Sequence, residues 1–181
     1  KRDGKWVDVS DDLSSFRQTV LDINRAGKAL KGIEPGRGGF TVRGLAPVLD
    51  ADGRRLGSVE VLIGFSDVLS ALEGQEGLAS RLYMNKSLLP ITTRLQDADK
   101  YPVLDDRFVL ISGQDHASLD PLVTTDLLAR GAGERVADVL GDTALTLFPV
   151  RDYKGEQIGV MVLGQDVSGP RGIIRTGKQV F

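Results

Sequence analysis

An arginine and a glutamate stand in the middle of two predicted strands, where they have the chemistry to bind a charged small molecule. Arg43 lies in the first strand of a predicted hairpin and Glu60 in the second. A guanidinium offers a planar fork of donors that matches the two oxygens of a carboxylate, whereas a glutamate accepts from an ammonium group. Two interpretations stay open: the pair lines a ligand pocket, or it forms a cross-strand ion pair on a solvated face.

Further side chains in the same half of the sequence can contribute to such a pocket. Arg17 is either a pocket cation or a solvated helix charge, and Arg37 lies in the glycine loop 36–39. That loop lacks the Lys-Ser/Thr of a nucleotide-binding loop and leads into a strand, so it does not indicate phosphate binding. Trp6 and Tyr83 either stack on a ligand or pack in a core. The other aromatic candidates for the pocket are Phe16 and Phe40.

The hairpin that carries the charged pair occurs a second time, 102 residues further along the chain. Segments 47–66 and 149–168 share six identical residues at this offset. Each copy has an Asp three residues before a Gly, at Gly53 and at Gly155, which is typical of a tight turn. A repeat of this length indicates two related domains in tandem. We therefore expect the two hairpins to superpose, each in its own antiparallel sheet.

The two copies differ in charge. At the offset of 102 residues Arg43 falls on Leu145 and Glu60 on Val162. A turn with an even number of residues would place Arg43 directly opposite Glu60. Because only one copy of the scaffold carries this pair, we expect the ligand pocket in the first copy.

Apolar periodicity and glycine spacing predict short helices and strands around these hairpins. A first helix is expected from Ser10–Asp12 to just before Gly27, and the others over 66–72, 87–95 and 123–129. Strands are expected over 29–33, 40–49, 56–65, 78–84, 107–112, 143–150 and 157–164. This order predicts an α/β fold with antiparallel hairpins.

The glycine-containing segment 74–77 is the expected domain boundary. The first unit then covers residues 1–73, the second covers 74–168, and a basic tail covers 169–181.

Composition excludes several classes of function. The net charge of −2 gives no indication of a nucleic-acid partner. The chain has no cysteine and one histidine, His116, so thiolate and histidine-rich metal sites are excluded, and we expect neither a metal nor a cofactor. No catalytic motif occurs, and we expect a binding protein, with a hydrolase of unassigned type kept as an alternative.

The hairpin residues carry a resemblance to a known family. A strand ending in Pro-Val, an Asp-x-x-Gly or Asp-x-Asp-Gly turn and a strand opening Leu/Ile-Gly resemble the last strands of Cache domains, extracytoplasmic relatives of PAS. The first copy looks like the double Cache ligand-binding regions of bacterial methyl-accepting chemotaxis receptors. The segments that carry this likeness are Phe16–Val20, Gly32–Glu34, Gly36–Phe40, Arg43–Val48 and Gly57–Glu60.

The resemblance implies two tandem PAS-like units, each with an antiparallel sheet flanked by helices. It places the opening helix and strands of the first unit upstream of Lys1. It also implies a periplasmic sensor domain of a membrane-anchored, homodimeric chemotaxis receptor, which signals through the second unit to a membrane helix after Phe181. Alternatives are the sensor domain of a membrane histidine kinase and a soluble PAS-like cofactor or interaction domain.

These inferences combine into an expected binding site. We expect a first-unit pocket lined by Arg43, with Phe16, Arg17, Phe40 and Glu60 around it, and a small carboxylate as ligand. If Glu60 is free to accept an ammonium the ligand is an amino acid, and if it is locked onto Arg43 the ligand is a plain organic acid. Arg43→Ala is then expected to fold and to lose the ligand.

Overall fold

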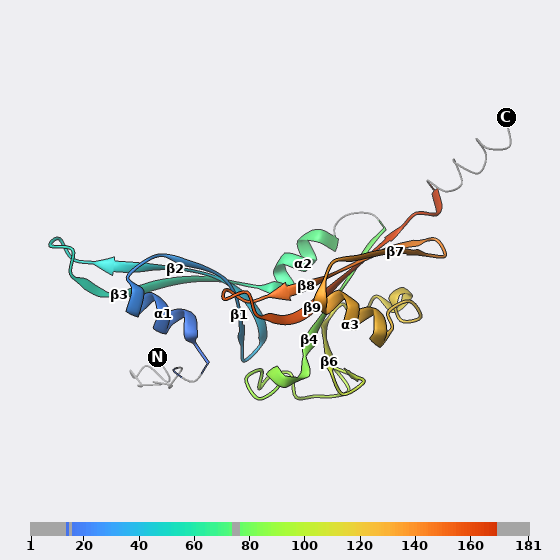
Figure 1. Cartoon of the computed structure of the whole chain (residues 1–181), viewed down its shortest axis with the longest axis horizontal. Coiled ribbons are helices and arrows are strands. Elements are labelled where there is room, and N and C mark those ends of the chain that lie inside the picture. The colour runs from blue at the N-terminus through green and yellow to red at the C-terminus, as the bar shows by residue number, and fades with distance from the viewer. Residues whose placement is uncertain (1–13, 15, 74–76, 170–181) are drawn as a thin grey trace, which may run out of the picture.

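The computed structural model describes residues 14, 16–73 and 77–169, and this part of the chain forms two antiparallel sheets with three α-helices (Figure 1). The first sheet has the order β1-β2-β3: β1 (Leu30–Gly36), β2 (Gly39–Leu49) and β3 (Arg55–Gly64). The second has the order β5-β6-β4-β9-β8-β7: β4 (Leu78–Asn85), β5 (Val103–Leu104), β6 (Phe108–Ser112), β7 (Val136–Leu140), β8 (Thr143–Arg151) and β9 (Gln157–Asp166). The helices are α1 (Gln18–Ala26), α2 (Phe65–Glu73) and α3 (Thr125–Gly133), with 3₁₀ turns η1 (Lys86–Leu88) and η2 (Ala117–Leu119). The expected α/β fold with an antiparallel sheet for each hairpin is confirmed.

The two hairpins have the same turn. In each, a turn aspartate accepts from the backbone N–H groups two and four residues later: Asp50 at 3.1 and 2.7 Å, and Asp152 at 2.8 and 2.9 Å. Gly53 and Gly155 hold equivalent positions at φ 78° and 90°, where a side chain would be strained. The pairing register shifts at the same point beside both turns. The repeat found in the sequence therefore describes two equivalent hairpins.

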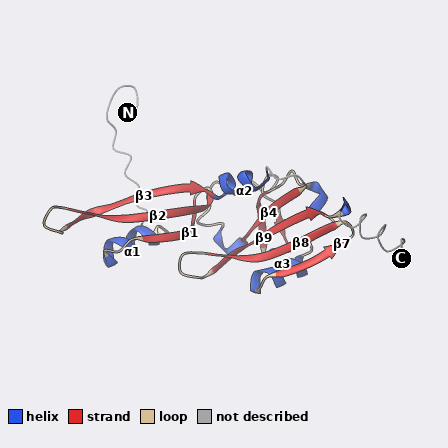
Figure 2. Cartoon of the chain, turned by 90° about the horizontal axis from the view of Figure 1, so that it is seen from above, coloured by secondary structure: helices blue, strands red, loops and turns tan. Residues whose placement is uncertain are grey.

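The surroundings of the two hairpins differ. β9 pairs with β4 on its far side, whereas β3 forms the edge of its sheet. The second sheet is packed on both faces, with α3 in one hydrophobic cluster and α2 in the other. In the first sheet α1 packs against all three strands on one face (Figure 2). Val59, Val61 and Ile63 point to the other face and are 53%, 67% and 51% exposed.

The helix expected over 87–95 is wrong. Only η1 forms, and the chain then continues through turns to β5. Pro90 explains the difference, because proline lacks the N–H that a helix interior needs and its ring clashes with the preceding turn. The amide of Arg94 donates instead to the carbonyl of Arg37, at 2.9 Å. This bond joins the loop between η1 and β5 to the turn between β1 and β2.

The first helix starts later than expected. α1 begins at Gln18, and Phe16 lies in a turn before it. Its expected end is correct, since Gly27 closes the helix in the left-handed conformation and donates to the carbonyl of Ile23. The expected start at Ser10–Asp12 lies outside the described residues. Two short strands, β5 and β7, were not expected from the sequence.

None of the described helices has the length and apolarity needed to cross a membrane.

Candidate ligand pocket

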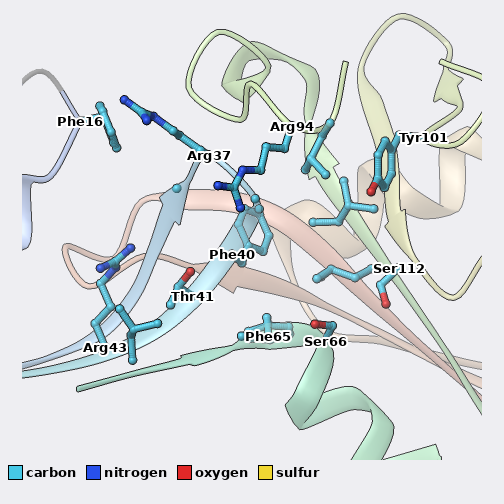
Figure 3. Close-up of a pocket in the computed structure, with 18 of the residues that line it drawn as sticks. Phe16, Arg37, Phe40, Thr41, Arg43, Phe65, Ser66, Arg94, Tyr101 and Ser112 are labelled. Atoms are coloured by element: carbon cyan, nitrogen blue, oxygen red, sulfur yellow. The ribbon is translucent and has the colours of Figure 1, made fainter. Parts of the chain in front are cut away.

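A cavity of about 510 Å³ lies between the two sheets, at the end of the first sheet where β1 turns into β2 (Figure 3). Among the described residues that line it are four arginines and no aspartate or glutamate: Arg17, Arg37, Arg43 and Arg94. The cavity is therefore lined by positive charge and by groups that donate hydrogen bonds.

The turn between β1 and β2 places one of these arginines. Gly36 pairs with Gly39 across the turn, which leaves Arg37 and Gly38 as its two tip residues. Gly39 has a φ of 104°, a conformation that residues with a side chain rarely adopt. The glycine loop noted in the sequence is thus a tight hairpin turn that presents Arg37 at the cavity.

Arg43 lies on β2 and is held by two carboxylates. Its Nε is 3.2 Å from Glu34, its Nη1 forms an ion pair with Glu60, and its side chain is 1% exposed. The direct opposition that an even-numbered turn would give does not occur, because Arg43 lies opposite Leu62 and Glu60 opposite Leu45. The hairpin loop has an odd number of residues and is followed by a bulge, so the two charged residues meet diagonally.

Glu34 joins this ion pair to the first turn of α1. Its carboxylate accepts from the backbone N–H of Thr19 at 2.9 Å and from the Thr19 hydroxyl at 2.8 Å. A carboxylate at this position satisfies helix amides that otherwise have no partner and faces the positive end of the helix dipole. Burial raises the pKa of Glu34 above its usual value, while the bonds from Thr19 act in the opposite direction.

Phe16 and Arg17 lie where α1 begins. The guanidinium groups of Arg17 and Arg37 lie 5.6 and 5.7 Å from the centre of the Phe16 ring, within the range of cation–π attraction. The Nε and Nη1 atoms of Arg17 are buried and have no hydrogen-bond partner in the described structure. Buried donors are normally satisfied, and an anion in the cavity is one partner that would satisfy these two atoms.

The second sheet supplies the opposite wall of the cavity. Arg94 and Tyr101 come from the loop between η1 and β5, and Ser112 ends β6 (Figure 3). Sequence reasoning missed all three. The sequence did contain one signal, Pro90, which disfavours a helix at this position and favours a loop that can reach another part of the fold.

Aromatic rings and hydroxyl groups complete the lining. Phe40 is buried and packs edge-on against Phe65, with ring centres 6.3 Å apart. Thr41 and Ser66 add hydroxyl groups. An apolar wall with a few polar groups is typical of small-molecule sites.

The structure brings most of the sequence-predicted site residues together. Phe16, Arg17, Arg37, Phe40 and Arg43 all line the cavity. Glu60 stands behind the lining as the partner of Arg43. Trp6 lies outside the described residues. The cavity differs from the expected one in position, because residues of both sheets form it.

Comparison with known proteins gives the family. A family model for double Cache domains (dCache_3), described as the double sensory domain of two-component sensor kinases, matches residues 6–169. The chain belongs to the double Cache family. No curated protein and no solved structure matched the chain.

Membership makes this double Cache chain a sensory domain, and Cache domains are typically extracytoplasmic parts of membrane proteins. The side chains that line the cavity are of the kinds that bind a small molecule. Groups of three or more acidic or histidine side chains suited to a metal ion are absent from the described residues. What the pocket offers is a set of guanidinium groups and hydroxyls, which bind anions through charge-assisted hydrogen bonds.

Proposed function

We propose that this double Cache chain is the extracytoplasmic sensor region of a membrane receptor and that it binds a small organic acid in the cavity between its sheets. The supporting observation is the cavity lining, with four arginines and no carboxylate among the described residues. Guanidinium groups hold carboxylates through paired hydrogen bonds, and the partly enclosed site strengthens them.

The position of Glu60 favours a plain acid over an amino acid. Glu60 and Glu34 both engage Arg43, so together they more than balance its charge. Neither carboxylate belongs to the cavity lining, so the described lining offers no acidic group to an ammonium. Arg17, at the start of α1, and Arg94, in the loop between η1 and β5, reach the cavity from opposite walls. Arg17 is the stronger candidate of the two, because two of its donors are buried with no partner among the described residues.

The role is binding, not catalysis. Ligand binding at arginines of both sheets favours the arrangement in which the walls are close together, so it shifts the population toward that state. The receptor is either a chemotaxis receptor, as the first-copy motifs suggest, or a sensor kinase, as the family description states. Both kinds would use the same pocket.

A thermal-shift screen tests this function. Organic acids such as succinate and citrate are compared with neutral amino acids and with amines. A ligand at 100 times its Kd adds about 2.7 kcal/mol to the stability of the folded state. We expect at least one acid to stabilise the protein, and Arg17→Gln to abolish that shift. Arg135→Gln is the matched control, since Arg135 is exposed and away from the cavity. Stabilisation by amines alone, or an unchanged shift in Arg17→Gln, contradicts the proposal.

A further inference from the structure

The tips of the two equivalent hairpins have different surroundings. Both point toward the same end of the molecule (Figure 2), where the first tip, residues 50–54, extends beyond α1. Arg55, directly after this tip, donates to the carbonyl of Arg25 on α1 at 3.5 Å. The second tip reaches α1 and β1. At the offset of 102 residues, Tyr153 and Lys154 of the second tip replace Ala51 and Asp52 of the first. At these two positions the docked tip thus carries an aromatic hydroxyl and a cation, where the free tip has a methyl group and a carboxylate.

Three contacts fix the docked tip. The Tyr153 hydroxyl donates to Asp22 on α1 at 2.7 Å, and the Lys154 ammonium lies 3.3 Å from the same carboxylate oxygen. The backbone N–H of Tyr153 donates to the carbonyl of Ile33 on β1 at 2.9 Å. Side chain and backbone therefore hold the tip to two neighbouring elements.

Gly32 on β1 makes room for this contact. A Cβ atom at this position would lie 2.5 Å from the Tyr153 Cβ and 2.8 Å from its Cα. Real atoms do not approach so closely, and the atoms concerned belong to the rigid part of the tip. The close approach of Tyr153 to β1 therefore depends on glycine at position 32.

The helix that receives the tip also forms part of the pocket. Arg17 directly precedes α1, and Asp22 lies five residues further, or about 7.5 Å along the helix axis. Thr19 on the first turn binds Glu34, which holds Arg43 of the cavity wall. A short, hydrogen-bonded helix moves largely as one body, so a shift at Asp22 also moves its N-terminal end.

We infer that Tyr153 and Asp22 are positioning residues for the anion site and act through α1 on Arg17. The inference rests on the proposed function, because it concerns the regulation of the same pocket. Docking of the second tip holds α1 where Arg17 faces the cavity. By linkage, an anion bound at Arg17 stabilises the docked tip by the same coupling. The path from ligand to second sheet runs through α1 into β8 and β9.

The decisive test needs no ligand. Tyr153→Phe removes one hydroxyl and keeps the ring against Gly32. We expect it to shift the NMR signal of the Arg17 Nε–H group and to speed amide exchange in α1. Asp22→Asn keeps an acceptor for the hydroxyl but loses the charge that attracts Lys154, so its effect should be smaller. Asp52→Ala, on the free tip, is the matched control and should leave both readouts unchanged. An unaltered Arg17 signal in Tyr153→Phe, or an equal change in Asp52→Ala, overturns the inference.

The Kd of an anion is a second measurement, and a contact with a purely structural role would leave it unchanged. Citrate is titrated into the wild type and both tip variants. We expect its Kd to rise about fivefold in Tyr153→Phe, the size expected for one hydrogen bond, and to stay unchanged in Asp52→Ala. Citrate binding with the same Kd in Tyr153→Phe contradicts the coupling. An Arg17 signal that shifts in a protein that binds no organic acid counts against the proposed function and still supports the coupling.

Discussion

Arg43 carries a structural role that changes what its substitution should do. It is buried between Glu34 and Glu60, and Glu34 also caps α1. Arg43→Ala leaves two carboxylates close together with their shared cation removed, one of them fully buried. We expect a loss of about 3–5 kcal/mol in the free energy of unfolding, measured by urea denaturation. The neutral folding behaviour expected from the sequence assumed an exposed or pocket-facing side chain.

The comparison for this measurement is Arg135→Ala, which removes an exposed arginine. Surface substitutions of this kind usually change stability by less than about 0.5 kcal/mol. A loss below about 1 kcal/mol in Arg43→Ala would show that the two glutamates tolerate each other without the guanidinium.

Tyr153 gives the protein a distinctive response to alkaline pH. Burial, followed by the bond to Asp22, raises its pKa from 10.0 to about 12. Because the folded-state pKa lies above the unfolded one, the contribution to stability is complete below pH 10.0 and is lost as the pH rises through about 12. In an ultraviolet titration of phenolate formation, Tyr153→Phe should lack the step near that pH.

The same titration can test how much Asp22 contributes to the raised pKa of Tyr153. It accepts from Tyr153 and pairs with Lys154, and these contacts lower its own pKa below 3.8. Asp22→Asn removes the negative charge that opposes phenolate formation, so the pKa of Tyr153 should fall. A Tyr153 step at the same pH in both proteins would mean that burial alone sets the shift.

At the scale of elements, the paired turns offer a matched experiment. Asp50 and Asp152 make the same two bonds to their turns, so alanine removes these two contacts from each. Asp50 also pairs with the exposed Arg54 at 3.0 Å, and an exposed pair of this kind adds little stability. The free tip has one long, exposed bond beside it to α1, whereas the docked tip is held to α1 and β1 by three contacts, so fraying of the free tip should cost the fold less. We expect Asp152→Ala to lower the free energy of unfolding by about 1–2 kcal/mol and Asp50→Ala by less than about 0.5 kcal/mol. Equal losses would show that docking adds nothing to the second turn.

The sequence predicted those elements whose signals are local. Turn aspartates and glycines fix both hairpins through bonds within five residues, and Gly27 ends α1 by its own backbone conformation. The failure at 87–95 has a non-local cause. The Arg94 amide finds its partner on Arg37, far away in the chain, and Pro90 removes the helical alternative.

At the scale of the whole molecule, the site depends on how the two sheets meet. Motifs within the first copy predicted Arg17, Arg37 and Arg43, because they lie on or beside its helix and hairpin. The wall that contains Arg94 and Tyr101 comes from the second sheet, and nothing in the local pattern of 89–101 says which surface that loop will face. The sequence therefore predicted residues of the wall that the first copy supplies and none of the wall that the second sheet supplies.

The two sheets should also differ in local stability. β3 is an edge strand with Val59, Val61 and Ile63 exposed, whereas β9 lies between β4 and β8 with both faces packed. Fewer neighbours mean a smaller cost of local opening. We expect amide exchange at the bonded positions of β3 to be about tenfold or more faster than at the equivalent positions of β9.

Mass spectrometry of the exchanging protein checks this expectation, and the shared turn geometry makes the two hairpins an internal control. Equal protection of β3 and β9 would show that the first sheet is as stable as the second despite its open edge. The effect of a bound organic acid on amide exchange is a second test of the difference between the two sheets. Because the pocket joins both sheets, the acid should slow exchange most at residues 37–43, on the less protected sheet, and little in β9, where opening is already rare.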